Sequence, residues 1–295
     1  MGTFLGHIIP GLALTLLGLW HTTNTIRAYC FKGSANFTVK FWYPFYGPLS
    51  KLKHLELIFI LSCSILAILA QILEFPDLHL SFKPVNLEHA TMFLHLAIFA
   101  GFTLSAEVSQ TSSNLSGVTG ILAASVFGQE LFLLHFHSTD HVGLEGHYHW
   151  LLQIIVFVSV VAASAAASFP ANFPAALVLS VSVIFQGCWF MNMALMLWHP
   201  GFVPEGCFMQ LDETSLGHMH GAVACKSIDA DMRARALANL QFSWILLGIL
   251  LCTGCICLKL ARNCVPRSQS TEYEQLRNRS TDVSIAIDSF KTSRI

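Results

Sequence analysis

Long uninterrupted runs of apolar residues recur along this chain, separated by short polar stretches. Seven runs are long enough for a helix of roughly 20 residues to cross a hydrocarbon core of about 30 Å. None shows the period-two alternation of a barrel strand, and lipid cannot satisfy the backbone groups of an open strand. The pattern therefore predicts an all-α fold, a seven-helix integral membrane bundle. Its spans lie near Phe4–Trp20, Leu55–Ile72, Ala90–Leu104, Leu115–Phe136, Trp150–Phe169, Ala175–Trp198 and Ala238–Leu258.

Composition supports a membrane environment. Of 295 residues, 54% are hydrophobic and 11% are charged, and the mean hydropathy is +0.59, values that exclude an ordinary soluble globule. We expect a transmembrane domain over residues 1–258 and a polar, disordered cytoplasmic tail over residues 259–295. The first run lacks a basic residue ahead of its apolar core, so it is interpreted as a retained helix rather than a cleaved signal peptide. An endomembrane or plasma-membrane location follows.

Basic residues in the connections predict the orientation. Twelve Lys and Arg residues fall on one side of the predicted membrane and four on the other, and the richer side is expected to face the cytoplasm. The amino terminus is then lumenal or extracellular and the tail is cytoplasmic. The glycosylation sequons at Asn36 and Asn114 fall on the cytoplasmic side, so glycans at either position would contradict this orientation.

Histidines gather on the non-cytoplasmic side, where eleven of the fourteen are expected. Five of them lie between His135 and His149, where the apolar run that ends near Phe136 meets polar sequence. Histidine is tolerated at a membrane interface, but it is also the commonest metal ligand and titrates between about pH 5 and 8. The sequence therefore predicts a lumen-facing site that binds a divalent transition metal such as zinc or senses acid. The candidate metal ligands in this pattern are His89, His137, His141 and His149.

Glu130 is an acid within an apolar run, which makes it a candidate proton carrier. It lies seven residues before His137, about 10 Å along a helix, so one straight helix cannot bring both to the same ion. On the preceding, antiparallel helix, His95 lies six residues inside His89, or about 9 Å. We therefore predict two layers, a buried Glu130–His95 pair below a histidine mouth. This hypothesis requires the third and fourth helices to be neighbours.

Other polar residues have a structural alternative. Intramembrane Glu, His and Gln can hydrogen-bond neighbouring helices, and histidine-rich connections can be solvated surface. Gln186, deep in the sixth run, is expected to bond another helix more often than a substrate. Cys207 and Cys225 in the last lumenal connection are candidates for a disulfide in an oxidising compartment. Four cysteines near the end of the last run suit either S-palmitoylation or inert packing.

Several separate motifs occur in a fixed order: Gly6-His7, Pro10-Gly11, Gly18-Leu19-Trp20, His89-Ala90-Thr91-Met92, the Glu130/His137/His149 stretch and Gln186-Gly187-Cys188-Trp189. Together they resemble the transmembrane protein 45 family, a domain-of-unknown-function group that includes transmembrane epididymal proteins. The His135–His141 stretch and Gly206-Cys207-Phe208-Met209 look most like its plant members, described as viral-response proteins. The resemblance covers about Met1 to Leu258 and implies a seven-helix membrane protein without an established reaction.

The resemblance also changes the weight of the candidate residues. The positions that match the family pattern are His7, His89, Glu130, His137, His149, Gln186 and Trp189. This chain departs from the pattern at His95, where animal members look aromatic. The resemblance therefore adds His7 to the candidate metal ligands. It favours a shared polar set over the Glu130–His95 pair, namely His7, His89, Glu130, His137 and His149.

Three classes of function remain open for a multi-pass membrane protein with such a site. In a metal-dependent membrane lipid hydrolase, a histidine-bound metal would activate water and Glu130 would move a proton. In a pH- or metal-responsive transporter or sensor, the same groups would act as ligands. A structural adaptor would have no chemical site and would bind other membrane proteins. The chain has no His-Glu-x-x-His element, phosphate loop or Gly-x-Ser-x-Gly elbow, and nothing in it suggests nucleic-acid binding.

Overall fold

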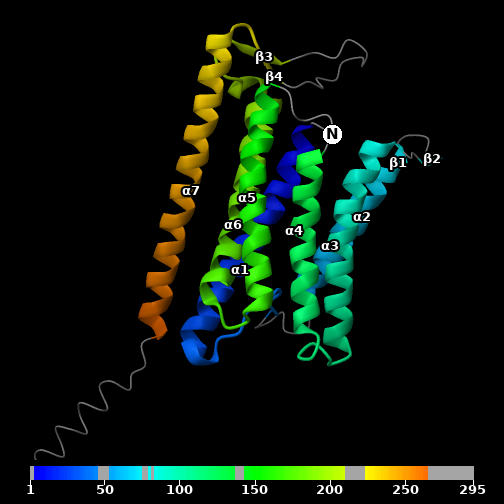
Figure 1. Cartoon of the computed structure of the whole chain (residues 1–295), viewed down its shortest axis with the longest axis vertical. Helices are drawn as coiled ribbons and strands as arrows, with labels where there is room; N and C mark the ends of the chain where they lie inside the picture. Colours follow the sequence, from blue (N-terminus) through cyan, green and yellow to red (C-terminus); the bar gives the residue numbers. More distant parts are fainter. Residues whose placement is uncertain are drawn as a thin grey trace, which may run out of the picture.

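A computed structural model describes residues 3–45, 53–74, 79–80, 83–136, 143–209 and 223–264. Within these ranges, seven helices run side by side (Figure 1), and each is long and apolar enough to cross a membrane. The prediction of an all-α seven-helix membrane bundle is therefore confirmed. The helices are α1 (Phe4–Lys32), α2 (Leu55–Ile72), α3 (Pro84–Val108), α4 (Ser116–Phe136), α5 (Gly143–Ser168), α6 (Phe173–Trp198) and α7 (Ile228–Cys264).

Short elements decorate the connections. Strand β1 (Leu73–Glu74) pairs antiparallel with β2 (His79–Leu80), and β3 (Cys207–Met209) pairs antiparallel with β4 (Val223–Cys225). Two 3-10 turns complete the described elements, η1 (Ser34–Asn36) after α1 and η3 (Pro200–Phe202) after α6.

Three helices extend well beyond the apolar runs that predict them. α1 continues from Trp20 to Lys32, α3 begins at Pro84, and α7 begins at Ile228. The apolar pattern marks only the part of a helix that suits lipid, whereas backbone hydrogen bonding continues through polar residues until a cap ends it. Proline suits the first position of α3, because the first amides of a helix have no partner within it.

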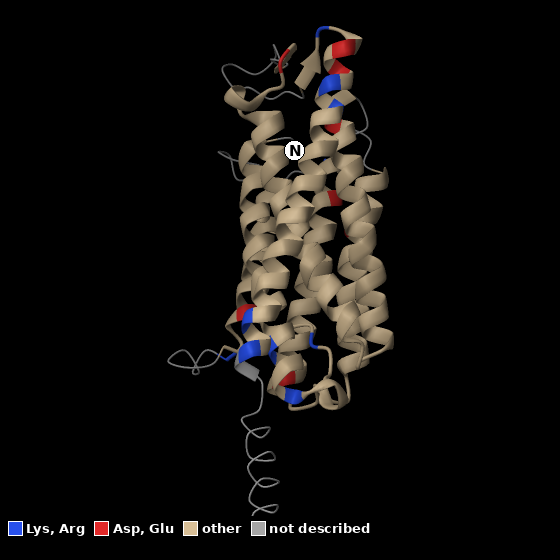
Figure 2. Cartoon of the chain, turned by 90° about the vertical axis from the view of Figure 1, so that its left-hand side faces the viewer, with Lys and Arg blue, Asp and Glu red and all other residues tan. Residues whose placement is uncertain are grey.

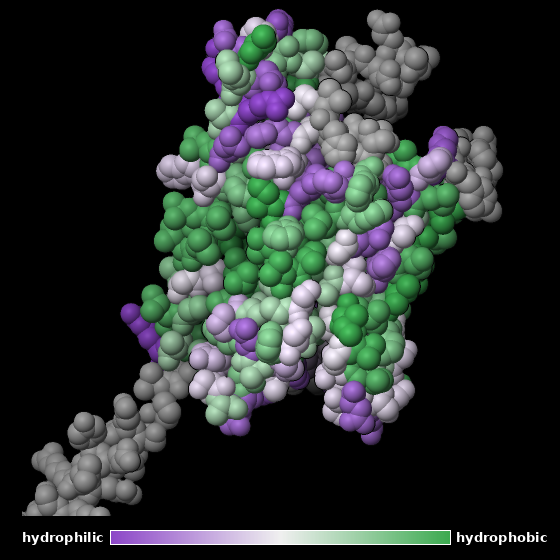
Figure 3. All heavy atoms as spheres, in the orientation of Figure 1, coloured by the Kyte–Doolittle hydropathy of each residue, from purple (hydrophilic) through white to green (hydrophobic). Residues whose placement is uncertain are grey.

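The two ends of the bundle are distinct. The amino terminus and both small sheets lie at one end, here called the amino end (Figure 1). The α1–α2, α3–α4 and α5–α6 connections and the last turns of α7 lie at the other, here called the carboxyl end. Charged residues gather mainly at these two ends (Figure 2), and an apolar band covers much of the face between them (Figure 3). The orientation of the ends relative to the cytoplasm stays a prediction.

Helices α1 and α6 cross at very short range, because glycines line the contact. A Cβ built on Gly18 would lie 2.6 Å from the backbone nitrogen of Ile184, and a Cβ on Gly187 would overlap the backbone of Thr15. Small residues allow such close approach between membrane helices. Both glycines belong to motifs of the family resemblance, so these motifs have a packing explanation.

The best-packed part of the bundle lies between α5 and α6. Trp189 is fully buried there, and its indole Nε1–H donates to the backbone oxygen of Tyr148 over 3.0 Å. The Tyr148 hydroxyl then donates to Oε1 of Gln241 on α7 over 2.9 Å. This chain of contacts ties three helices together.

Candidate functional site

Two of the predicted histidines meet at the amino end of the bundle. His7 on α1 is 8% exposed and His149 on α5 is 5% exposed. The ring of His7 stacks on Trp198 with centroids 4.2 Å apart, and the ring of His149 stands edge-on to His7 at 6.0 Å. Phe190 flanks His7 at 5.7 Å. These four side chains, His7, His149, Phe190 and Trp198, form what we call the amino-end histidine site.

Backbone carbonyls fix the tautomer of these rings. Nδ1 of His7 lies 3.1 Å from the oxygen of Thr3, and Nδ1 of His149 lies 3.0 Å from the oxygen of Glu145. A carbonyl oxygen only accepts, so Nδ1–H donates and the lone pair of each neutral ring is on Nε2. Metal-binding histidines commonly donate their other ring N–H to such an oxygen, which orients the ring and makes the ligand nitrogen more basic.

His89 on α3 has the same local geometry. Its Nδ1 lies 2.8 Å from the oxygen of Val85, again the carbonyl four residues earlier on the same helix. Within the described ranges, however, no group of three or more His, Cys, Asp or Glu side chains could hold a metal ion, so His89 does not complete such a group with His7 and His149. The predicted ligands His137 and His141 lie outside the described residues.

Glu130 faces the interior of the bundle and is 9% exposed. Helix α3 packs beside α4 (Figure 1), as the two-layer hypothesis requires. The structure nevertheless has no hydrogen bond or ion pair between Glu130 and His95, which is half-buried on α3. Among the described residues, no side chain hydrogen-bonds the Glu130 carboxyl.

Gln186 bonds a neighbouring helix. Its side chain is fully buried, and Nε2 donates to Oγ of Ser159 on α5 over 2.7 Å. The Ser159 hydroxyl in turn lies 2.8 Å from that of Ser182 on α6. These contacts match the structural alternative for Gln186.

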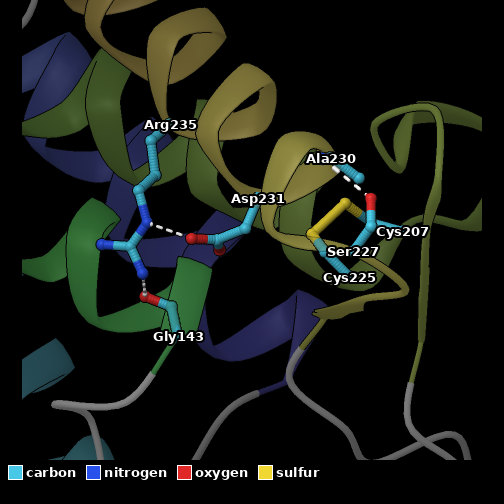
Figure 4. The surroundings of a disulfide bond; sticks show 7 residues. All are labelled: Gly143, Cys207, Cys225, Ser227, Ala230, Asp231 and Arg235. Carbon is cyan, nitrogen blue, oxygen red and sulfur yellow. Dashed lines mark hydrogen bonds and ion pairs between the residues drawn. A yellow bond between two sulfur atoms is a disulfide. The ribbon is translucent and has the colours of Figure 1, made fainter.

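Cys207 and Cys225 form a disulfide that joins β3 to β4 (Figure 4). Hydrogen bonds hold the same region against the bundle beside α7. Oγ of Ser227 accepts from the amide of Ala230 over 3.2 Å, and Arg235 bonds both Asp231 and the backbone oxygen of Gly143. The disulfide thus lies at the end of the bundle that is predicted to face an oxidising compartment.

The sequence did not single out a second polar centre, at the carboxyl end. Glu56, in the first turn of α2, is 5% exposed. Its Oε2 accepts from Nε1 of Trp20 over 2.8 Å and from the backbone amide of Tyr43 over 2.9 Å, and its Oε1 lies 2.8 Å from Nε2 of His21. We call Glu56, Trp20, His21 and Tyr43 the carboxyl-end glutamate cluster.

Tyr43 closes this cluster from the α1–α2 connection. Its hydroxyl shares a hydrogen bond with Oγ1 of Thr25 over 2.9 Å. Burial raises the pKa of Tyr43 to about 12; the Thr25 hydrogen bond opposes this shift and the nearby Glu56 adds to it. The phenol is therefore held neutral inside the cluster.

Sequence patterns gave little indication of this cluster. An acid at the start of a helix is common, because the amino end of the helix dipole favours negative charge. Glu56 begins an apolar run, whereas Glu130 lies well inside one, so only Glu130 looked unusual. The usable signal was Trp20-His21 directly after the first apolar run, two side chains with polar atoms that need partners near a membrane boundary.

Comparisons with known proteins agree with the motif resemblance. Residues 116–258 match the model of DUF716, described as a family of unknown function. Transmembrane epididymal protein 1A of Mus musculus is 27% identical over 215 residues, which cover 68% of each chain. Transmembrane epididymal protein 1 of Rattus norvegicus is 27% identical over 217 residues, again 68% of each chain. Taken with the seven apolar helices, these matches identify the chain as an integral multi-pass membrane protein, and they support its likeness to the transmembrane protein 45-like DUF716 family.

Proposed function

We propose that the amino-end histidine site reversibly binds a divalent transition metal ion such as zinc, and that the protein is a metal-responsive membrane sensor or transporter. One observation carries the proposal. His7 and His149 come from helices far apart in the sequence, lie side by side, and each anchors Nδ1–H on a backbone carbonyl. This arrangement assigns Nε2 of both rings as the ligand nitrogen.

The neighbouring aromatic rings support the same role. Trp198 stacks on His7 and Phe190 flanks it, so the ring of His7 is held in one orientation before an ion arrives. A ligand that is already oriented loses less conformational entropy on binding. The proposed ion would take further ligands from the predicted histidines His137 and His141, which lie outside the described residues, or from water.

The depth of Glu130 favours reversible binding over hydrolysis. The backbone oxygen of Leu134 on α4 meets the side chain of Gln153 on α5 over 2.9 Å, which aligns these two positions. Gln153 lies one turn deeper than His149, and Glu130 lies one turn deeper than Leu134. Glu130 is therefore about 12 Å deeper than His149 along the bundle. That separation is too long for Glu130 to take a proton directly from water bound at His149, but it suits a carboxyl on a path for protons or ions.

Metal binding to detergent-purified protein tests the proposal. We expect wild-type protein to take up about one zinc ion per chain in a micromolar titration, and His7→Ala and His149→Ala to abolish saturable uptake. His135→Ala is the matched control, because His135 is an exposed histidine at the same end, bonded through Nδ1 to Gln153. Each variant must elute as a single species in size-exclusion chromatography.

Three outcomes would overturn the proposal in different directions. Equal uptake by all four proteins would assign the ion to another site. No uptake by well-folded wild-type protein would leave the adaptor alternative. Uptake accompanied by zinc-dependent release of fatty acid from phospholipid vesicles, lost in Glu130→Gln, would instead support the hydrolase.

A further inference from the structure

The last turns of α7 carry thiols that face outward. Cys252 and Cys255 are exposed and Cys257 is partly buried. Helix α7 is also the least buried of the seven spans, so its outward side chains meet lipid or headgroups rather than another helix. The neighbouring Leu251 and Leu258 are 62% and 65% exposed, which gives this part of α7 a continuous apolar surface.

Basic residues locate the membrane boundary on this helix. Lys259 and Arg262 are exposed, and such residues mark the level of the lipid headgroups. Cys257 lies about 3 Å and Cys255 about 6 Å inside Lys259 along the axis, whereas Cys252 lies about 10 Å inside it. Cys255 is therefore the exposed thiol nearest the boundary among the described residues of α7.

The other described cysteines differ from Cys255 in exposure, position or bonding. Cys63 is also exposed, but it lies midway along α2, in the centre of the apolar zone. Cys188 is half-buried and lies 3.9 Å from the Thr15 hydroxyl, and Cys207 and Cys225 are joined in a disulfide. Cys30 lies near the end of α1 but is partly buried. Among the cysteines whose side chains the structure describes, an exposed side chain and a boundary position coincide only near the end of α7.

We propose that Cys255, with Cys257 beside it, is S-acylated by a long-chain fatty acyl group from acyl-coenzyme A. The cysteine sulfur attacks the thioester carbonyl carbon, the new carbon–sulfur bond forms as the bond to coenzyme A breaks, and the thiol proton passes to the released coenzyme A thiol. No oxidation or reduction is involved. The acyl chain then lies in the bilayer along the apolar surface of α7, where its buried methylenes add to membrane affinity.

This modification is independent of the proposed metal site, but it requires the predicted orientation. Acyl-coenzyme A is available on the cytoplasmic side, and the last turns of α7 lie at the carboxyl end of the bundle, which is predicted to face that side (Figure 1). Reversible S-acylation of juxtamembrane cysteines needs this same combination of an exposed thiol and membrane proximity.

Acyl exchange on the full chain from eukaryotic cells tests the proposal. Free thiols are blocked, thioesters are cleaved with neutral hydroxylamine, and the released thiols are labelled with a polyethylene-glycol maleimide without reduction of the disulfide. We expect a hydroxylamine-dependent gel shift in wild-type protein and its complete loss in Cys255→Ser/Cys257→Ser. Cys63→Ser and Cys252→Ser should keep the shift.

Two results would overturn the proposal. The first is the absence of a hydroxylamine-dependent shift in wild-type protein. The second is a full shift in the double variant, which would assign the thioester to another cysteine. Mass spectrometry of the wild-type peptide that contains Cys255 locates the acyl group without any variant, so the test does not depend on how the variants fold.

Discussion

The two ends of the bundle bury polar side chains in opposite ways. At the carboxyl end, an acid and donors complement each other, because the carboxylate of Glu56 accepts from Trp20 and Tyr43 and lies against His21. At the amino end, two bases lie side by side, the imidazoles of His7 and His149. Each ring bonds through Nδ1 to a backbone oxygen four residues earlier in the chain. Complementary groups stabilise a fold by themselves. Two adjacent bases gain from an added cation, which supports the proposed metal binding at the amino end.

The largest expected difference between the ends is the compartment that each one faces. Asn36 in η1 and Asn114 in the α3–α4 turn are exposed sequon residues at the carboxyl end. If that end is cytoplasmic, neither can receive a glycan, and treatment with an endoglycosidase should leave the electrophoretic mobility unchanged. A new sequon placed in the exposed segment before β3 should be glycosylated, and endoglycosidase treatment should then change the electrophoretic mobility of that variant.

The contrary result would be clear. Loss of the glycan in Asn36→Gln or Asn114→Gln would mean that the carboxyl end is lumenal. The proposed S-acylation of α7 would then fail with the orientation, whereas metal binding at the amino-end histidine site could still be measured in detergent.

The next effect concerns stability. Glu56→Ala would leave the indole N–H of Trp20, the amide of Tyr43 and His21 without their acceptor. Removing one partner of a buried polar cluster costs about 3–5 kcal/mol, so we expect unfolding at markedly lower temperature or denaturant concentration. The matched control is Glu107→Ala, because Glu107 forms a more exposed 3.7 Å ion pair with Lys53, which should contribute at most about 1 kcal/mol. Equal losses in both variants would contradict the structural role of Glu56.

The contrast between the ends also explains what sequence patterns could predict. Helix number and order follow from apolar runs, because crossing a bilayer constrains every residue of a span in the same way. The histidines around the end of the fourth run pointed to His149, and the family resemblance added His7. The pattern did not select Glu56, whose role depends on donors from α1 and from the α1–α2 connection. Which donors meet at Glu56 depends on the tertiary structure, so a pattern along the chain does not indicate it.

The pairing of Glu130 with His95 shows the limit of depth arguments. The prediction needed α3 beside α4, and the structure has that arrangement. Rise per residue gives the level of a side chain along a bundle, but hydrogen bonding also depends on rotation about each helix axis. The structure gives these two residues no mutual hydrogen bond or ion pair, so Glu130 enters the proposal as a proton carrier without that partner.

A smaller effect is expected at the amino end from Trp198→Leu. The indole holds the ring of His7 in a stack at 4.2 Å, and leucine keeps the apolar contact but not the flat surface. Loss of groups that orient a metal ligand typically costs about 10- to 100-fold in affinity. Zinc titration should therefore give a higher Kd with unchanged stoichiometry, whereas His7→Ala removes binding altogether. An unchanged Kd in folded Trp198→Leu would show that the stack does not position the ligand.

The smallest effect concerns the ionisation of Tyr43. Burial raises the pKa of Tyr43 to about 12, whereas an unfolded tyrosine titrates near about 10. The folded state therefore binds this proton more tightly than the unfolded state does. The stabilisation from Tyr43 is fully present below about pH 10 and decreases as the pH rises toward about 12, because the unfolded state ionises first.

Subtraction isolates this one phenol among the five tyrosines of the chain. The ultraviolet phenolate absorbance of Tyr43→Phe, subtracted from that of wild-type protein, should give a single transition near pH 12. The variant also loses the hydrogen bond to Thr25, so at neutral pH it should be less stable by about 1 kcal/mol. A transition near pH 10, with an unchanged free energy of unfolding at neutral pH, would mean that the phenol is open to water. Tyr43 of the α1–α2 connection would then not be buried in the carboxyl-end glutamate cluster. The contrast between a carboxyl end whose buried polar groups are paired and an amino end that is proposed to bind metal would then fail at the carboxyl end.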